Sequence, residues 1–287
     1  MPMIKDWVVA GAIAVLATAA VCPHPGYAQT KIPATLQKAA QLNVGVKCDA
    51  PPAAFLDEQG KPAGIDIEFA RHIAELAFGD PGKAAFTCVT SATRIQMLTT
   101  GKVDLVIATM APTEERKKVV DFATSTNWDS STVLVRAESR FNKLEDFNGK
   151  TLLTTKGGWQ APYLEKQYPQ INLVKLDSVN DAIQALRQGR ADGVTQDVEP
   201  LLAAADQDPA LKLTDIAFLI GWGAPAVRRG DDELRLFINE MVSLAKKDGT
   251  FEAAVRKYAS GKLREIMLDG YEKPAPDGSS SENSVVR

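Results

Sequence analysis

The sequence has few of the residues that hydrolases and metal proteins use. It contains 2 histidines and 3 cysteines in 287 residues, and His24 and Cys22 fall in the first 28. With His72 as the remaining histidine, we expect neither a histidine-based metal centre nor a histidine-driven hydrolase. The motifs GxxxxGK[ST] and GxGxxG are absent from the sequence as well. We therefore predict no metal, no nucleotide and no other cofactor.

An excess of positive charge is also missing. The formal net charge is −3 at pH 7, which argues against a general nucleic-acid binder. With 45% hydrophobic and 24% charged residues, the composition is that of an ordinary globular protein. The chain is long enough for two domains.

The first residues have the pattern of an export signal. Lys5 precedes an apolar run over residues 7–21, and residues 26–28 end in a small-residue cleavage pattern. The run is short, and two prolines soon follow it, so it fits a membrane span poorly. We predict a signal peptide over residues 1–28, cleavage after Ala28 and a periplasmic location. An uncleaved anchor is the alternative.

Cys48 and Cys88 are the cysteines that follow the predicted signal peptide. Two cysteines in an oxidising compartment suggest one disulfide. Two buried free thiols fit the sequence as well. The sequence alone therefore leaves both possibilities open.

The most informative stretch runs over residues 94–116. Its first residues have a helical period, and Gly101 ends this helix. Residues 103–108 form an apolar run typical of a strand buried on both faces. A new helix begins near Thr113, whose hydroxyl can cap it. Because ligands in open α/β sheets bind where strands end and helices begin, we predict a small-molecule site over residues 109–116.

Part of this stretch occurs twice in the chain. Residues 95–106 align without a gap with residues 183–194, and both segments share Ile, Gln, Leu, Gly, Asp and Val at equal spacing. The first segment leads to Thr109 and the second to Asp197. We interpret the pair as two similar lobes that each offer a strand end to one cleft. A generic helix–glycine–strand unit is the alternative interpretation.

The segment GKVDLVIATMAPTEERKKVVDF, residues 101–122, carries a family resemblance. It contains Thr-x-x-Arg followed by a basic pair and Asp-Phe. With residues 44–47 and 64–68, it resembles the polar-amino-acid family of periplasmic solute-binding proteins, the receptors of ABC importers. The resemblance covers roughly residues 42–263 and is greatest to receptors for aspartate and glutamate.

The resemblance implies an α/β architecture, the two-lobe periplasmic-binding-protein fold of type II. Each lobe is expected to be a mainly parallel sheet flanked by helices, with two crossing strands between the lobes. The expected ranges are 29–132 for the first part of lobe 1, 133–222 for lobe 2 and 223–264 for the return to lobe 1. Residues 265–287 have little to bury and are expected to be disordered. The implied partners are an amino acid and the membrane permease subunits of an ABC importer, with the receptor itself a monomer.

The resemblance also implies how the common part of an amino acid is held. Arg116 would grip the α-carboxylate, assisted by Thr109 and the backbone around Ala111. Asp197 would take the α-ammonium from the other lobe. The physical chemistry agrees, because a zwitterion that leaves water needs both of its charges met. Arg is the best partner for a carboxylate.

Three further residues bear on the ligand side chain. The resemblance implies that Lys47 and Arg94, both at predicted strand ends, take a side-chain carboxylate. Trp159 adds bulk at the glycine turn of the second lobe. We therefore predict a receptor for glutamate or aspartate that closes over its ligand.

Two other functions remain open from the sequence. Some relatives of this family are cyclohexadienyl or arogenate dehydratases, which need an acid or base facing the leaving group, and we identify no residue for that role. A sensory amino-acid receptor is the other alternative. We expect a binding protein and not an enzyme.

Overall fold

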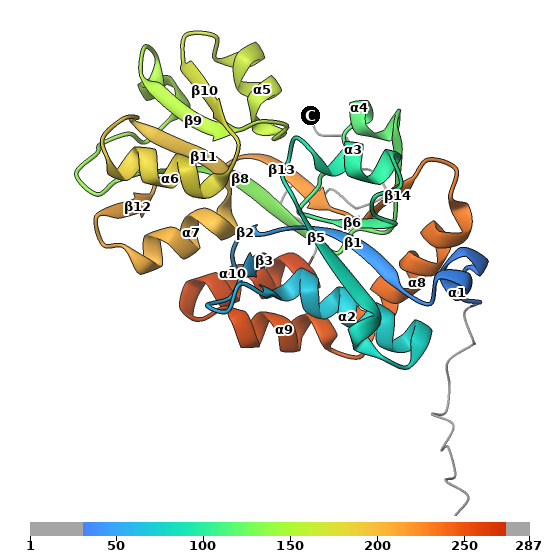
Figure 1. Cartoon of the computed structure of the whole chain (residues 1–287). Helices are drawn as coiled ribbons and strands as arrows, with labels where there is room; N and C mark the ends of the chain where they lie inside the picture. The colour runs from blue at the N-terminus through green and yellow to red at the C-terminus, as the bar shows by residue number, and fades with distance from the viewer. Residues whose placement is uncertain (1–30, 274–287) are drawn as a thin grey trace, which may run out of the picture. The chain divides into compact units, whose positions relative to one another are not determined.

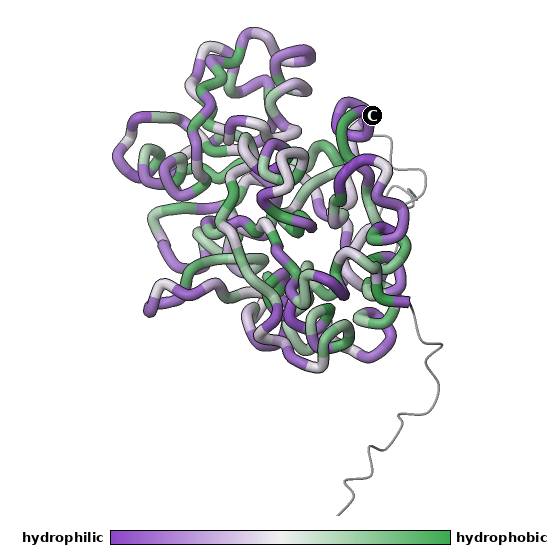
Figure 2. Tube along the Cα trace, turned by 45° about the vertical axis from the view of Figure 1, so that its right-hand side comes forward, coloured by the Kyte–Doolittle hydropathy of each residue, from purple (hydrophilic) through white to green (hydrophobic). Residues whose placement is uncertain are grey.

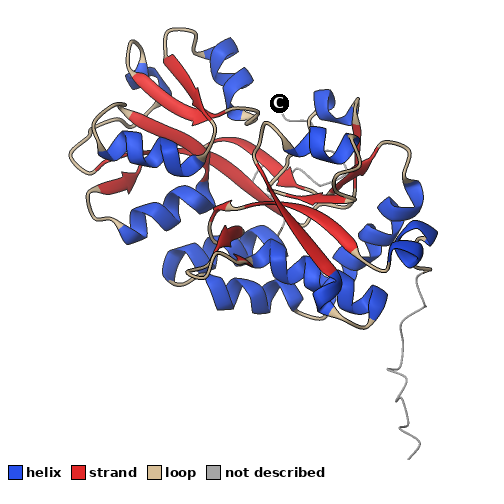
Figure 3. Cartoon of the chain, viewed as in Figure 1, coloured by secondary structure: helices blue, strands red, loops and turns tan. Residues whose placement is uncertain are grey.

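The computed structural model describes residues 31–273. The predicted signal peptide lies outside these residues. The described part contains two main sheets, each flanked by helices, and a small third sheet (Figures 1 and 3). This agrees with the predicted two-lobe α/β fold. No helix in residues 31–273 combines the length and apolarity needed to cross a membrane.

The first sheet belongs to lobe 1 and has five strands. Its central strands are parallel, and the return of the chain adds β14 antiparallel to its neighbours. The order is β5 (Ala84–Val89), β1 (Leu42–Lys47), β6 (Leu105–Ile107), β14 (Ala226–Arg228) and β7 (Val120–Phe122). Strands β1 and β6 are almost wholly buried, as expected for a parallel sheet covered by helices on both faces.

The second sheet belongs to lobe 2 and has six strands. Its parallel strands lie beside a long antiparallel strand, β8, which also pairs with β13. The order is β10 (Asn172–Leu176), β9 (Thr151–Thr155), β11 (Gly193–Asp197), β8 (Asn127–Arg136) and β12 (Leu211–Leu213), with β13 (Phe218–Gly223) on β8. A small third sheet holds β2 (Asp49–Ala50), β3 (Ala54–Leu56) and β4 (Pro62–Ala63).

The two main sheets repeat one topology. In lobe 1, β1 lies between β5 and β6, and in lobe 2, β9 lies between β10 and β11. The next strand in each sheet is antiparallel: β14 pairs with β6 in lobe 1, and β8 pairs with β11 in lobe 2. The sequence repeat maps onto the third strand of each lobe and the helix before it, α3 (Arg94–Thr99) and α6 (Val179–Arg187). The interpretation of the repeat as two similar lobes therefore agrees with the structure.

Helices cover both sheets. Around lobe 1 these are α1 (Ala34–Ala39), α2 (Ile65–Phe78), α3, α4 (Glu114–Lys117), α8 (Asp232–Lys247), α9 (Thr250–Tyr258) and α10 (Gly261–Glu272). Around lobe 2 these are α5 (Gln160–Gln167), α6 and α7 (Val198–Gln207). Short 3-10 turns lie at Pro81–Lys83 and Leu144–Phe147. Figure 2 shows hydrophobic residues along the interior segments and hydrophilic residues on many outer turns.

Helix α10 corrects the expectation for the C-terminal tail. We expected disorder from residue 265, but the chain is helical through Glu272. Its apolar face buries Leu263, Met267 and Tyr271 in the same core as α9 and part of α7. The indole N–H of Trp128 on β8 donates to the Lys273 carbonyl at 2.9 Å. The helix forms because these buried side chains offset the entropy of ordering it. Residues 274–287 lie outside the described residues.

The structure joins Cys48 and Cys88 by a disulfide, with 5.5 Å between their Cα atoms. Strands β1 and β5 pair in parallel, and Val46 is the register partner of Cys88. Cys48 directly follows β1, so the two sulfurs meet at the carboxyl ends of adjacent strands. This is the first of the two alternatives that the sequence left open.

Candidate functional site

The loop after β6 contains the first group of predicted site residues. The strand ends at Ile107, and Thr113 caps α4 by accepting the Arg116 N–H at 3.4 Å. Between them, Thr109 has a φ of 44°, which is uncommon for a residue with a Cβ. Such strained residues concentrate at ligand clamps and active sites. Ala111 is 6% exposed.

Arg116 bridges the two lobes. One guanidinium nitrogen, Nη1, donates to the Ala111 carbonyl at 2.7 Å, and Nη2 donates to the Gly157 carbonyl of lobe 2 at 3.0 Å. Gly157 has a φ of 73°, and a Cβ there would lie 2.5 Å from the Ser91 carbonyl oxygen. Glycine is therefore required where the second lobe approaches the first.

Arg94 is 2% exposed and lies beneath the same loop. Its Nη1 donates to the Ala108 carbonyl at 2.5 Å and to the Thr109 carbonyl at 3.3 Å. Its Nε has no hydrogen-bond partner within the described part of the chain. Burial, and then the positive charge of Arg116, lower its pKa. Two of the predicted cations, Arg94 and Arg116, are therefore close enough to repel each other.

Lys47 ends β1 and is 3% exposed. Its Nζ lies 3.9 Å from Oδ1 of Asp49. Burial is the largest influence on the Lys47 ammonium and lowers its pKa, while Asp49 opposes this and Arg94 adds to it. The lowered pKa means that an additional anion close to Lys47 would stabilise its charged form.

Asp197 ends β11 in lobe 2 and is held by two side chains. The indole N–H of Trp159 donates to Asp197 Oδ1 at 2.9 Å, and the Gln160 amide donates to the same oxygen at 2.8 Å. Burial raises the pKa of Asp197, whereas the Trp159 hydrogen bond and the charge of Lys47 lower it. A Cβ on Gly221 would lie 2.6 Å from the Trp159 ring, so the indole packs directly on the β13 backbone.

Two adjoining cavities lie in this region. The first is lined by Thr109, Ala111, Asn127, Asp129, Trp159, Asp197, Glu199, Gly221, Trp222 and Gly223. The second is lined by Ala53, Asp66, Ile107, Ala108, Thr109, Thr126, Asn127, Glu199, Gly223, Ala224, Pro225 and Tyr271. Four of the seven predicted site residues, Thr109, Ala111, Trp159 and Asp197, thus line one cavity, whereas the three predicted cations are not among the residues that line either cavity.

Three carboxyl groups of this region were missed by the sequence analysis. Glu199 is 4% exposed and lines both cavities. Burial, and then Asp197, raise its pKa to about 8. Burial also raises the pKa of Asp66 to about 8, with Lys47 opposing. The pKa of Asp129 is raised as well, by burial and then by Glu199. Of the three, only Glu199 had a signal in the sequence, because it follows the predicted site residue Asp197 by two residues. An acidic residue at this position is equally explained by its favourable interaction with the dipole of α7.

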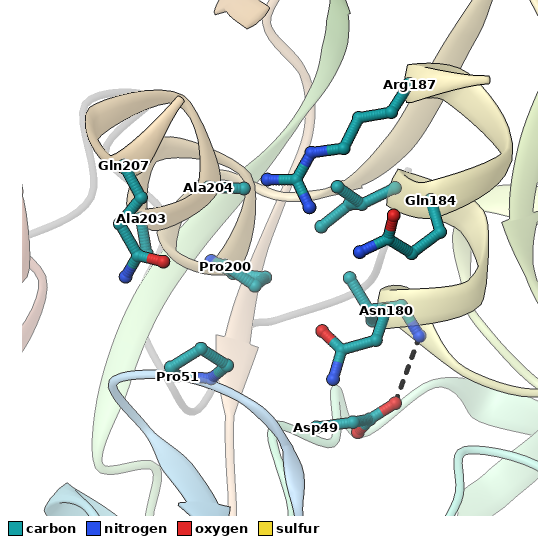
Figure 4. A pocket seen from close by; sticks show the side chains of 11 residues that line it. Asp49, Pro51, Asn180, Gln184, Arg187, Pro200, Ala203, Ala204 and Gln207 are labelled. Carbon is teal, nitrogen blue, oxygen red and sulfur yellow. Dashed lines mark hydrogen bonds between the residues drawn. The ribbon is translucent and has the colours of Figure 1, made fainter. Parts of the chain in front are cut away.

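A larger cavity of about 330 Å³ lies between β2 of lobe 1 and helices α6 and α7 of lobe 2 (Figure 4). Figure 4 shows Asp49 and Pro51 on one side and Asn180, Gln184 and Arg187 on the other. Asp49 Oδ2 accepts the Val179 backbone N–H at 3.0 Å, at the N-terminus of α6. None of the predicted site residues lines this cavity. Within residues 31–273, no group of three His, Cys, Asp or Glu residues could hold a metal ion.

Comparison with known proteins identifies the family. Residues 42–261 match the bacterial extracellular solute-binding proteins, family 3. A glutamine-binding protein of Geobacillus stearothermophilus is 37% identical over 185 residues, which span 64% of this chain and 71% of the relative. An ABC transporter glutamine-binding protein of Bacillus subtilis is 33% identical over 200 residues, 69% of this chain and 73% of the relative.

The solved structures agree. The solute receptor for L-cysteine of Neisseria gonorrhoeae superimposes with a TM-score of 0.76 at 29% identity, covering 85% of this chain and 97% of the receptor. The chain belongs to the bacterial extracellular solute-binding proteins of family 3.

Proposed function

We propose that this chain is an extracytoplasmic receptor that binds a free amino acid between its two lobes and delivers it to an ABC importer. The observation that carries the proposal is the facing pair of opposite charges. Arg116 lies on α4, the helix that follows β6 in lobe 1, and Asp197 ends β11 in lobe 2. The matched relatives named as glutamine-binding proteins support an amino acid as the ligand.

In this proposal the two charges hold the zwitterion. Arg116 exchanges its bonds to the Ala111 and Gly157 carbonyls for the α-carboxylate, which is a stronger acceptor. Asp197 takes the α-ammonium on Oδ2, while Trp159 and Gln160 keep Oδ1 occupied and fix the carboxylate plane. Thr109 and Ala111 contribute the wall and backbone of the cavity.

We propose an acidic side chain for the ligand, glutamate or aspartate. Arg94 interacts electrostatically with both Lys47 and Arg116, and Asp197 is an anion that interacts with all three. Buried cations of this kind are costly without anions. Because Arg94 bonds backbone carbonyls and Lys47 does not line either cavity, we assign them a through-space effect on the ligand.

A screen of the common amino acids by thermal shift, followed by calorimetric titration, tests the proposal. We expect a rise in melting temperature with glutamate or aspartate, and its loss in Arg116→Ala with every amino acid. As a matched control, Arg187→Ala removes an arginine outside the proposed ligand site. No stabilisation by any amino acid would contradict the receptor proposal.

We propose binding without catalysis, and an activity assay separates the two. The pure protein is incubated with prephenate or arogenate and assayed for the aromatic product. Turnover that Asp197→Asn abolishes would overturn the proposal in favour of a dehydratase. Transport by the importer is tested separately, by growth of a deletion strain on the identified amino acid as sole nitrogen source.

A further inference from the structure

We propose that Glu199 is a specificity-determining residue that acts as a neutral carboxylic acid and donates a hydrogen bond to an acceptor on the ligand side chain. This inference rests on the proposed function, since it concerns an acidic amino acid in the cleft. It assigns a direct contact to a residue outside the charged pair that holds the zwitterion.

The position of Glu199 carries the proposal. It is the one acidic residue that lines both cavities of the cleft, within the part of the chain that the structure describes. It follows Asp197 by two residues, on the first turn of α7. A ligand whose ammonium lies on Asp197 would therefore bring its side chain close to Glu199.

Few neighbours of Glu199 stabilise the ionised form of its carboxyl group. Asn127 Nδ2 donates to Glu199 Oε1 at a long 3.4 Å. Among residues 31–273, no lysine or arginine lines either cavity. A buried carboxylate without a cation is costly, whereas the protonated acid is a hydrogen-bond donor. The second cavity is also lined by Asp66, which is 8% exposed and whose Oδ2 has no hydrogen-bond partner in the described part of the chain.

Titratable groups on four other elements interact electrostatically with Glu199. Asp66 lies on α2, Asp129 on β8, Asp197 on β11 and Tyr271 on α10, and their charges interact with one another through this region. Four carboxyl groups converging on one small space cannot all be charged. Burial raises the pKa of Glu199 to about 8, which agrees with the neutral form at pH 7.

The sum of the charges near the site also favours a neutral Glu199 and an acidic ligand. Lys47, Arg94 and Arg116 are the cations near the site, and Asp49 pairs with Lys47 while Asp197 faces all three. One positive charge remains if the other carboxyl groups are neutral. Glutamate or aspartate, with a net charge of −1, neutralises it. A basic amino acid would instead require protons to leave the acidic group.

Calorimetric titration with glutamate and aspartate at pH 7 and pH 9 tests the proposal on the full mature chain. If Glu199 must be protonated, the affinity of the wild-type protein falls about tenfold between these values, because its pKa is near 8. In Glu199→Gln the amide is a donor at both values. We expect this variant to lose less affinity between pH 7 and pH 9 than the wild type does.

The matched control is Glu58→Gln, which makes the same chemical change at an exposed position. It should retain the pH dependence of the wild type. Titration at pH 8 in buffers of different ionisation enthalpy should show net proton uptake in the wild type and less in Glu199→Gln.

Three outcomes overturn the inference. An equal loss of affinity in wild type and Glu199→Gln would assign the pH dependence to Lys47 or to the ligand. An affinity that does not change with pH would remove the requirement for a proton. Stronger binding at pH 9 with proton release, for a basic amino acid, would make Glu199 an acceptor. Each of these outcomes still includes amino-acid binding and therefore rejects only the role of Glu199. The receptor proposal itself fails only if no amino acid binds.

Discussion

At the scale of single residues, the proposed selectivity for an acidic side chain is tested at Arg94 and Lys47. Arg94→Gln removes the charge and keeps donors for the Ala108 and Thr109 carbonyls. Lys47→Met keeps the length of the buried side chain without its charge. If these cations stabilise a ligand carboxylate, each change should weaken glutamate and aspartate binding by about ten- to a hundredfold, as expected for a charge-assisted interaction.

The same variants should bind glutamine with a much smaller loss, because glutamine carries no side-chain charge. Calorimetric titration with glutamate, aspartate and glutamine measures the difference. An equal loss for the two ligand classes, or a wild-type preference for glutamine, would contradict the acidic specificity.

Gly221 and Trp159 form a second contact that a single residue controls. A Cβ at position 221 would lie 2.6 Å from the Trp159 ring, so Gly221→Ala should force the indole away from Asp197. We expect a loss of unfolding free energy of about 1–3 kcal/mol, as for other overpacked sites. Urea unfolding measures it, and Trp159→Leu in the same background should recover part of the loss. Additive losses in the double variant would show that the two residues are not coupled.

At the scale of elements, α10 supports the crossing strand β8. It buries Leu263 and Met267, and the carbonyl of Lys273 accepts from Trp128 on β8. A chain ending at Ser260 should lose at least about 3 kcal/mol of unfolding free energy, since two large apolar side chains lose their burial. A chain ending at Lys273 keeps α10 and serves as the control. Equal urea midpoints for the two truncated chains would show that α10 contributes nothing.

The disulfide between Cys48 and Cys88 fixes the carboxyl ends of β1 and β5, beside Lys47. Its sequence separation is 40 residues, and the chain-entropy model gives a stabilisation of about 3–4 kcal/mol. Thiol titration of denatured, unreduced protein should find no free thiol in residues 31–273. Reductant should lower the urea midpoint of the wild type and leave that of a Cys48→Ser, Cys88→Ser double variant unchanged. Two reactive thiols in material from an oxidising compartment would contradict the bridge.

For the whole molecule, hydrogen bonds join the two lobes. Arg116 donates to Gly157, and Asp49 accepts from Val179 at the start of α6. We predict that a saturating ligand shifts an open population toward this arrangement, with β8 and β13 as the hinge. Small-angle scattering should show a smaller radius of gyration with glutamate. Arg116→Ala should show no such change, and an unchanged radius in the wild type would contradict the clamp.

The sequence by itself determined the local units and their repetition. The helix before Gly101, the buried strand after it and the cap at Thr113 all correspond to α3, β6 and α4. These elements follow from signals within a few residues, namely apolar periodicity, a glycine and a capping hydroxyl. The two-lobe fold followed from the repeat and from the family resemblance. The roles of the seven site residues in ligand binding stay predictions.

Only the tertiary structure decided how the charges are grouped. Glu199 and Asp66 are far apart in sequence, and each is unremarkable there as a residue in the first turn of a helix. They meet because the lobes bring α2 and α7 to one cavity. The same holds for α10, whose sequence is polar enough to suggest disorder until a core is available to bury its apolar face. The protonation of a carboxyl group depends on burial and on neighbours from other elements, so it has no signature in the local sequence.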